Sequence, residues 1–201
     1  MNHHVKRVTR TSEIREFTDQ YHSYIKWADR PSRKMYYSLH EDDRMVGVFA
    51  LASGFVRPKV IQDFLKQHKI AFNEVANNIV FCLAGQTDRN AGTKFLKLCR
   101  TDAKAWWKER YDDELKLMQT FVLPGRVEST LPRVGAVYKA DNWLNLGITK
   151  GETLITRTLY TPEERAAHPN AEVRRFKNGE VKYIHREFST TPQKIIFVRF
   201  V

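Results

Sequence analysis

Cysteine is scarce in this sequence, and long apolar runs are missing. The two cysteines, Cys82 and Cys99, have no CxxC spacing, which argues against a zinc site and a disulfide framework. No run approaches the roughly 18 apolar residues of a membrane helix. Lys6 and Arg7 are not followed by the apolar core of a signal peptide. We therefore expect a cytoplasmic protein with two buried thiols, no metal and no membrane partner.

Repeats, low-complexity segments and glycine-serine linkers are missing as well. The chain has 201 residues, of which 42% are hydrophobic, so it can bury a core without covalent cross-links. We expect a single domain over residues 1–201, with a flexible N-terminus at residues 1–11.

Positive charge is in excess. The formal net charge is +11, which produces a field that attracts polyanions. Nucleic acid is therefore the first partner to test. The alternative is a soluble basic protein that binds no polyanion.

Hydrophobic periodicity and turn residues predict an alternation of helices and strands. Helices are expected over residues 12–27, over a short stretch after Pro58, and from about 93 to 110. The predicted strands are 35–40 and 45–51 as a hairpin, 79–83, 115–122 and 194–201. Beyond Gly151 the chain is charged and loop-like, with a hairpin that turns at Asn178-Gly179.

The stretch from Ala136 to Gly147 predicts a strand, a turn and a second strand. Tyr138 would lie on the first strand beside the turn at residues 140–142. Trp143 opens the second strand, which alternates apolar and polar residues. Packing in a sheet is the alternative role for Tyr138 and Trp143.

A polar turn, residues 85–93, connects the expected strand 79–83 to the following helix. Its backbone N–H groups and the positive end of the helix dipole can bind an anion such as a pyrophosphate. The spacing of Arg89 and Gly92 falls short of a full phosphate-loop motif.

A histidine and a tyrosine of the first expected helix are candidates for catalytic residues. His22 is followed by Tyr24 on the expected helix 12–27. An imidazole titrates near neutral pH, which suits a general base. An amphipathic helix packed on a core is the alternative interpretation.

Basic residues gather in three places, each of which is either a phosphate contact or a solvated surface. In the C-terminal hairpin they alternate with Phe176 and Tyr183, which suits stacking on bases. The candidates for nucleic-acid binding are Arg30, Arg33, Lys34, Arg126, Arg133, Lys139, Arg174, Arg175 and Lys182.

Four stretches resemble the Mom-type DNA modification proteins of bacteriophages over about residues 20–150. The resemblance rests on Tyr21-His22-Ser23-Tyr24, on residues 45–51, on Asp88-Arg89-Asn90-Ala91-Gly92-Thr93, and on residues 135–143 with their tyrosine-x-alanine-x-x-tryptophan pattern. The resemblance implies an α+β, GNAT-like acyltransferase fold, in which helices flank a central mixed β-sheet. A basic loop and hairpin over 152–192 would extend it.

By this resemblance the protein modifies the N6 amine of adenine in phage DNA, so that host restriction enzymes no longer cut. The donor would be an acyl-CoA such as acetyl-CoA, or alternatively glycyl-tRNA. Because the amine is paired in a duplex, the base would be flipped out. The implied catalytic residues are His22, Tyr138 and Tyr24, the residues at the donor phosphates are Arg89, Asn90, Gly92 and Thr93, and the base-stacking residues are Trp27, Tyr36, Tyr37 and Trp143.

One departure from the family concerns a carboxylate. The family follows its strand with aspartate and proline, whereas Val122 is followed by Leu123 and Pro124. Either Glu128 or Asp141 replaces that carboxylate, or the chemistry is altered or lost. Two alternatives therefore stay open: an acyltransferase for a protein or small molecule, and a non-catalytic nucleic-acid-binding or anti-restriction protein.

Overall fold

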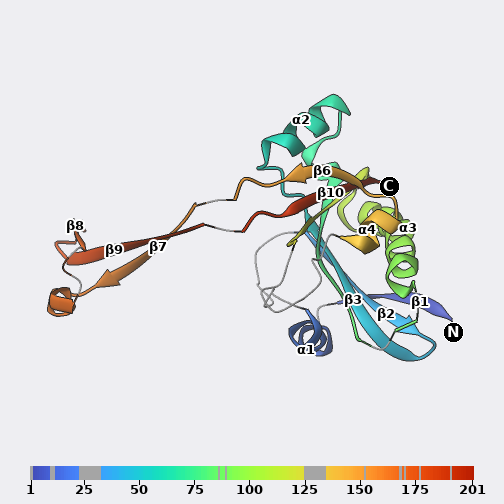
Figure 1. Ribbon diagram of the computed structural model, residues 1–201, viewed down its shortest axis with the longest axis horizontal. Helices are drawn as coiled ribbons and strands as arrows, with labels where there is room; N and C mark the ends of the chain where they lie inside the picture. Colours follow the sequence, from blue (N-terminus) through green and yellow to red (C-terminus); the bar gives the residue numbers. More distant parts are fainter. Residues whose placement is uncertain are drawn as a thin grey trace. The chain divides into compact units, whose positions relative to one another are not determined.

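The computed structural model describes residues 2–9, 12–22, 33–85, 87–88, 90–124, 135–151, 153–167, 169, 171–176, 178–190 and 192–201. Figure 1 shows the elements along the chain. They are β1 (His3–Val8), α1 (Ser12–Tyr21), β2 (Lys34–Glu41), β3 (Arg44–Ser53), α2 (Lys59–Gln67), η1 (Phe72–Glu74), β4 (Val75–Leu83), α3 (Ala91–Tyr111), β5 (Leu117–Val122), α4 (Ala136–Ala140), β6 (Leu144–Ile148), β7 (Thr153–Tyr160), η2 (Glu163–Ala167), β8 (Glu172–Arg175), β9 (Val181–Thr190) and β10 (Ile195–Phe200).

The chain forms two compact units, one of residues 1–149 with 194–201 and one of residues 150–193. The first unit contains a seven-stranded sheet in the order β1-β2-β3-β4-β5-β10-β6. Its neighbouring strands are antiparallel, except that β4 and β5 are parallel. The predicted α+β class, a mixed central sheet flanked by helices, is confirmed.

The two faces of this sheet are covered by different helices. Alternate residues of a strand point to opposite faces, and Tyr36 packs with Ile14 of α1 whereas Tyr37 packs with α3. Ile61 of α2 packs beside Val75 and Leu117. One face therefore carries α3 and α4, which lie side by side in Figure 1, and the other carries α1 and α2.

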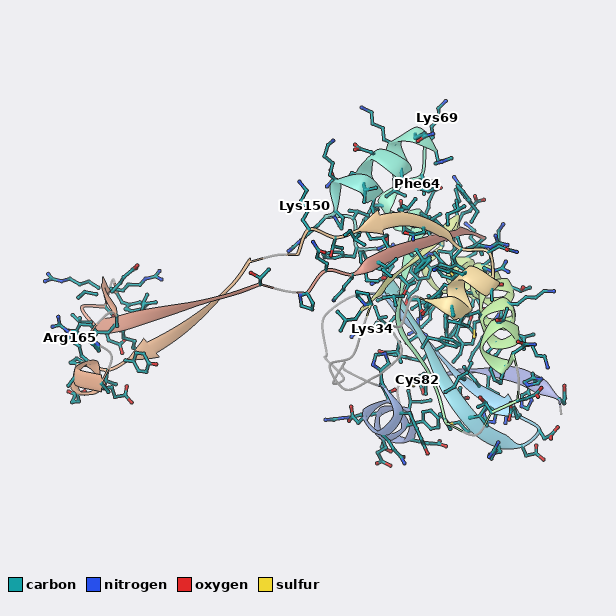
Figure 2. The ribbon with its side chains drawn as sticks, viewed as in Figure 1. Lys34, Phe64, Lys69, Cys82, Lys150 and Arg165 are labelled. Atoms are coloured by element: carbon teal, nitrogen blue, oxygen red, sulfur yellow. The ribbon has the colours of Figure 1, made fainter. Side chains whose placement is uncertain are left out.

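The predicted helix before Arg110 is confirmed as α3, in which buried apolar residues recur at helical spacing beyond the first turn. They are Phe95, Leu96, Cys99, Ala103, Trp106 and Trp107. Asp112 ends the helix in a left-handed conformation and donates its N–H to the carbonyl of Lys108. Burial raises the pKa of the Cys82 thiol to about 12, and it raises that of Cys99 as well. Figure 2 labels Cys82.

Two expectations about the first unit are wrong. Residues 3–8 are an edge strand, β1, paired with β2, although residues 1–11 were expected to be flexible. Tyr138 lies on a helix, α4, instead of a strand. Gly135 begins that helix at φ +69°, and its carbonyl accepts the N–H groups of Tyr138 and Lys139. The strand expected after Trp143 is confirmed as β6.

The second unit is a three-stranded antiparallel sheet in the order β7-β9-β8. Its β8–β9 hairpin at Asn178-Gly179 was predicted, but β7 was expected to be a loop. The alternating threonines and apolar residues of β7 are typical of a strand. Residues 150–193 contain eight lysines and arginines against six acidic residues, so little of the net charge of +11 resides there.

An ionic network joins β1, β2 and α3. Arg7 donates two hydrogen bonds to Asp102, at 2.8 and 2.9 Å, and one to Glu109 at 2.8 Å. Tyr37 donates its hydroxyl proton to Asp102 at 2.8 Å. Burial raises the pKa of Asp102, but the hydrogen bonds from Arg7 and Tyr37 and the charge of Arg7 outweigh it and hold that pKa below its usual value.

Among the described residues, no helix is long and apolar enough to cross a membrane.

Gly135→Ala tests the start of α4. A Cβ there would lie 2.5 Å from the Phe197 ring, and φ is positive, so we expect a loss of about 2–5 kcal/mol in the free energy of unfolding. Gly147→Ala is the matched control: φ is +108° but no atom lies within 4 Å, so it should cost only about 1–2 kcal/mol. Urea unfolding measures both. Equal losses would contradict the clash.

Asp102→Asn tests the ionic network. A carboxylate with a depressed pKa stabilises the folded state above its unfolded pKa, and this stability disappears as the pH falls through the folded pKa. We expect the wild type to exceed the variant by about 1–3 kcal/mol at pH 7, with the difference shrinking below about pH 4. Asp63→Asn, in an exposed pair with Lys59, should change stability little. A difference that is constant with pH would refute this assignment.

Candidate active site

The centre of the candidate site is the point where β4 and β5 stop pairing. The parallel ladder runs from Val75 and Leu117 to Asn78 and Thr120. Beyond that rung β4 continues to Leu83 and β5 to Val122, and the described residues form no further rung between them. The backbone groups of 79–83 and of 121–122 that face each other therefore form no hydrogen bonds across the gap between the two strands.

A bulge in β4 coincides with this point. Ala50 of β3 pairs with Val80 and Leu51 pairs with Asn78, so Ile79 is an extra residue in β4. The side-chain amide of Asn78 donates to the carbonyls of Ala50, at 3.0 Å, and Val80, at 2.7 Å. Asn78 therefore satisfies backbone groups that the bulge removes from the ladder.

Tyr138 meets Asn78 at the same place. Its hydroxyl donates to Oδ1 of Asn78 at 2.8 Å, and Thr120 donates its hydroxyl to the Asn78 carbonyl at 3.2 Å. The Tyr138 ring stacks on Phe197 at 5.9 Å and meets Trp143 edge-on at 5.1 Å. Tyr138, which the sequence analysis expected on a strand, thus lies on α4 and contacts Asn78 at the end of the parallel ladder.

Three of the expected base-stacking residues are buried. Tyr36, Tyr37 and Trp143 are 6%, 0% and 5% exposed, respectively. Tyr37 bonds to Asp102, and Trp143 donates its ring N–H to Asp141 at 2.9 Å. We therefore correct that expectation: the three rings belong to the hydrophobic core.

The carboxylate of Asp141 is engaged in structural contacts. Asp141 is 7% exposed, accepts the Trp143 N–H and pairs with Arg100 at 3.3 Å. These contacts tie α4 to α3. Leu123, where the family has aspartate, is partly buried after β5. Glu128 lies outside the described residues.

The turn before α3 is held from β2. Glu41 is buried, and its carboxylate accepts the backbone N–H of Asp88 at 2.8 Å. Lys94 pairs with the Asp88 carboxylate at 3.0 Å. Asn90 begins α3 at φ +65°, and its side chain makes no cap hydrogen bond, so the amides of Gly92 and Thr93 in the first turn are not capped by it.

Gly92 is needed for packing as well as for the turn. A Cβ at this position would lie 2.9 Å from Cγ2 of Val137, which belongs to α4. The glycine thus allows α3 to approach α4 closely. This close approach brings the first turn of α3 near the helix that carries Tyr138.

The catalytic candidates His22 and Tyr138 do not lie on the same face of the sheet. His22 follows α1, and its backbone N–H bonds to the carbonyl of Thr18. Tyr138 is on α4, on the opposite face. Six predicted site residues lie outside the described residues: Tyr24, Trp27, Arg30, Arg89, Arg126 and Arg133.

The described basic candidates fall into two groups. In the first unit, Arg33 forms an ion pair with Asp113, Lys34 begins β2, and Lys139 is exposed on α4. In the second unit, Arg174 and Lys182 are cross-strand partners, and both lie over the ring of Phe176, at 5.3 and 5.9 Å.

The second unit places a further cation on a ring. Arg175 is exposed on β8. Arg165, labelled in Figure 2, lies over the ring of Tyr183 at 4.9 Å. Among the described residues no group of three or more His, Cys, Asp or Glu side chains is arranged to hold a metal ion.

Comparison with family models and with curated proteins found no match. A Bacillus subtilis acetyltransferase in complex with CoA is 9% identical, with a TM-score of 0.45 over 100% of this chain and 99% of its own. An IAA acetyltransferase from Bacillus cereus is 11% identical, with a TM-score of 0.44 over 100% of both chains. A GNAT family acetyltransferase from Elizabethkingia anophelis with acetyl-CoA bound is 13% identical, with a TM-score of 0.43 over 100% and 99%.

These identities and TM-scores are low, so the function has to be argued from the geometry of the chain itself. Sequence analysis missed the polar residues of β4 and β5, chiefly Asn78 and Gln119. The available indication was polarity: Asn77 and Asn78 precede an apolar strand, and Gln119 and Thr120 interrupt another. Polar residues inside buried strands require partners.

The bond between Tyr138 and Asn78 can be tested by a double-mutant cycle. Tyr138→Phe leaves a buried acceptor without this donor and should cost about 1–3 kcal/mol in the free energy of unfolding. Asn78→Ala should couple with it by about 1 kcal/mol. As a control, Tyr111→Phe, which removes a hydroxyl bonded to the Lys34 carbonyl, should not couple with Asn78→Ala. Additive losses for Tyr138 and Asn78 would count against the contact.

Proposed function

We propose that this protein is an acyltransferase that takes an acyl group from an acyl-CoA and attaches it to an amino group. The observation that carries the proposal is the parting of the parallel strands β4 and β5 after Asn78 and Thr120, with the Tyr138 hydroxyl at the point of separation. An extended molecule with amide groups can pair with such backbone edges as a strand would.

The first turn of α3 supports the same donor. This helix follows β4 directly, so its N-terminus lies beyond the end of the strand whose inner edge is unpaired. The amides of Gly92 and Thr93, together with the helix dipole, suit a pyrophosphate. By the resemblance, Arg89 and Asn90, which precede this helix in the sequence, would also contact the donor phosphates. Glu41 would fix the turn through the Asp88 amide.

When bound, acyl-CoA supplies an activated thioester. The amine nitrogen forms the new bond to the acyl carbon as the carbon–sulfur bond breaks, and the sulfur must gain a proton. Tyr138 holds a hydroxyl proton at the separation of the strands, so we assign it the role of general acid, with Asn78 orienting its hydroxyl. The proton released by the amine requires a base, for which His22 is our candidate.

For the acceptor we propose the N6 amine of adenine in DNA. The net charge of +11 supports a polyanionic substrate. Arg174 and Lys182 over Phe176 suit contact with a phosphate backbone. A free amine on a small molecule or a protein is the alternative acceptor, and glycyl-tRNA is the alternative donor.

Mass spectrometry of nucleosides tests the reaction. Purified protein is incubated with DNA and acetyl-CoA, and in a parallel reaction with glycyl-tRNA. We expect a new adenosine species with acetyl-CoA. Tyr138→Phe should reduce its rate by about 10²–10⁴-fold, because a positioned acid contributes a factor of that order. Tyr111→Phe is the matched control and should retain activity.

Donor binding is followed by thermal unfolding. At 100 times the dissociation constant, acetyl-CoA should stabilise the wild type and Tyr138→Phe alike, by about 2.7 kcal/mol. DNA binding without a new nucleoside and without stabilisation by either donor would refute the proposal. Such a result favours the binding protein, for which Leu123 in place of a carboxylate is the supporting observation.

A further inference from the structure

Two buried amide oxygens near the separation of β4 and β5 receive no hydrogen bond from any residue that the structure describes. They are Oδ1 of Asn77 and Oε1 of Gln119. The two residues are register partners on adjacent parallel strands, whose backbones lie about 4.8 Å apart. Both face α2, because Val75 and Leu117, two residues earlier on each strand, pack against Ile61.

The orientation of Gln119 is fixed by a neighbouring backbone group. Its side-chain amide donates to the carbonyl of Phe55 at 3.0 Å, and the residue is 0% exposed. Its oxygen is therefore aimed away from that bond. A buried acceptor without a donor destabilises the folded state, so two of them on one rung indicate a site for a donor.

A pair of aromatic rings lies on the face of the sheet that carries these oxygens. Phe121 is two residues beyond Gln119 and therefore on the same face. It meets Phe55 edge-on at 5.5 Å. Phe55, whose carbonyl holds Gln119, is 37% exposed. Two amide acceptors are thus accompanied by apolar rings suited to a planar ligand.

We propose that Asn77 and Gln119 bind the amino group of the acyl acceptor, each oxygen accepting one N–H, and that this amino group is carried on an aromatic ring. This inference rests on the proposed function. Tyr138 approaches the separated strands from the α3 and α4 face, while Asn77 and Gln119 lie on the α1 and α2 face. The acceptor amine and the general acid would thus reach the reacting carbon from opposite sides of the sheet.

The chemistry of the oxygens selects this class of amine. A neutral NH2 group has two hydrogens for two acceptors, whereas a hydroxyl has one. Amide oxygens are uncharged, so they do not favour an ammonium ion as a carboxylate would. The amine therefore stays unprotonated and keeps its nucleophilic lone pair.

The test removes the amino group from the ligand. A short single-stranded oligodeoxynucleotide with one adenine is compared with the same oligonucleotide that carries unsubstituted purine at that position, so that the phosphate contacts cancel. Fluorescence anisotropy on the full chain gives both dissociation constants. We expect the wild type to bind the adenine oligonucleotide about tenfold more tightly, because purine leaves both oxygens unsatisfied.

Variants identify the residues responsible. Gln119→Leu and Asn77→Leu should each lower the ratio of the two constants from about ten to about three, because one of the two hydrogen bonds remains, with little change for the purine oligonucleotide. Asn77→Asp keeps an acceptor and should retain the discrimination even if Gln119→Leu fails to fold. Gln62→Leu, which removes a polar amide on the exposed side of α2, is the control and should bind as the wild type does.

The inference is overturned if the wild type binds neither oligonucleotide, if it binds both equally, or if Asn77→Leu leaves the ratio unchanged. Its failure is distinguishable from that of the proposed function. Acyl transfer to adenine without discrimination would refute only the amino-group site. Discrimination without transfer from any donor would support the amino-group site and refute the acyltransferase.

Discussion

The parting of two parallel strands is the constraint on which the rest of the site depends. β4 and β5 pair for four residues and then stop, and a separation of this kind exposes backbone groups that a regular sheet would satisfy. The bulge at Ile79 removes further ladder bonds, and Asn78 replaces them with its side-chain amide. Because the same residue accepts the Tyr138 hydroxyl, the irregular strand and the candidate acid are held by one side chain.

Contacts from neighbouring elements hold Tyr138 and the turn before α3 in place. Tyr138 is fixed by Phe197 and Trp143, and the latter is fixed by Asp141 and Arg100. The turn before α3 is fixed by Glu41 at the end of β2, which accepts the backbone N–H of Asp88. Asp141, a candidate for the replacement carboxylate, thus serves to position Trp143.

Much of the fold could be predicted from the sequence, since the strands of the β2–β3 hairpin and the apolar stripe of α3 follow simple periodicities. α4 could not, because five residues are too few for a helical period and only the left-handed conformation of Gly135 reveals the start. Of the residues in the candidate site, Tyr138 and Gly92 had been named from the sequence, whereas Asn78 and Gln119 had not. Their importance comes from strand register and a bulge, which local patterns do not encode. The prediction that Tyr36, Tyr37 and Trp143 stack on bases was wrong, because an aromatic residue can equally well pack in the hydrophobic core of the protein.

Backbone amide chemical shifts measured during a titration with acetyl-CoA test the central claim most directly. If the donor lies between the separated strands, the amides of 79–83 in β4 and of Gly92 and Thr93 in α3 should shift together, while those of the exposed face of α2 stay unchanged. Shifts that are absent from β4, or confined to other elements, would contradict the account.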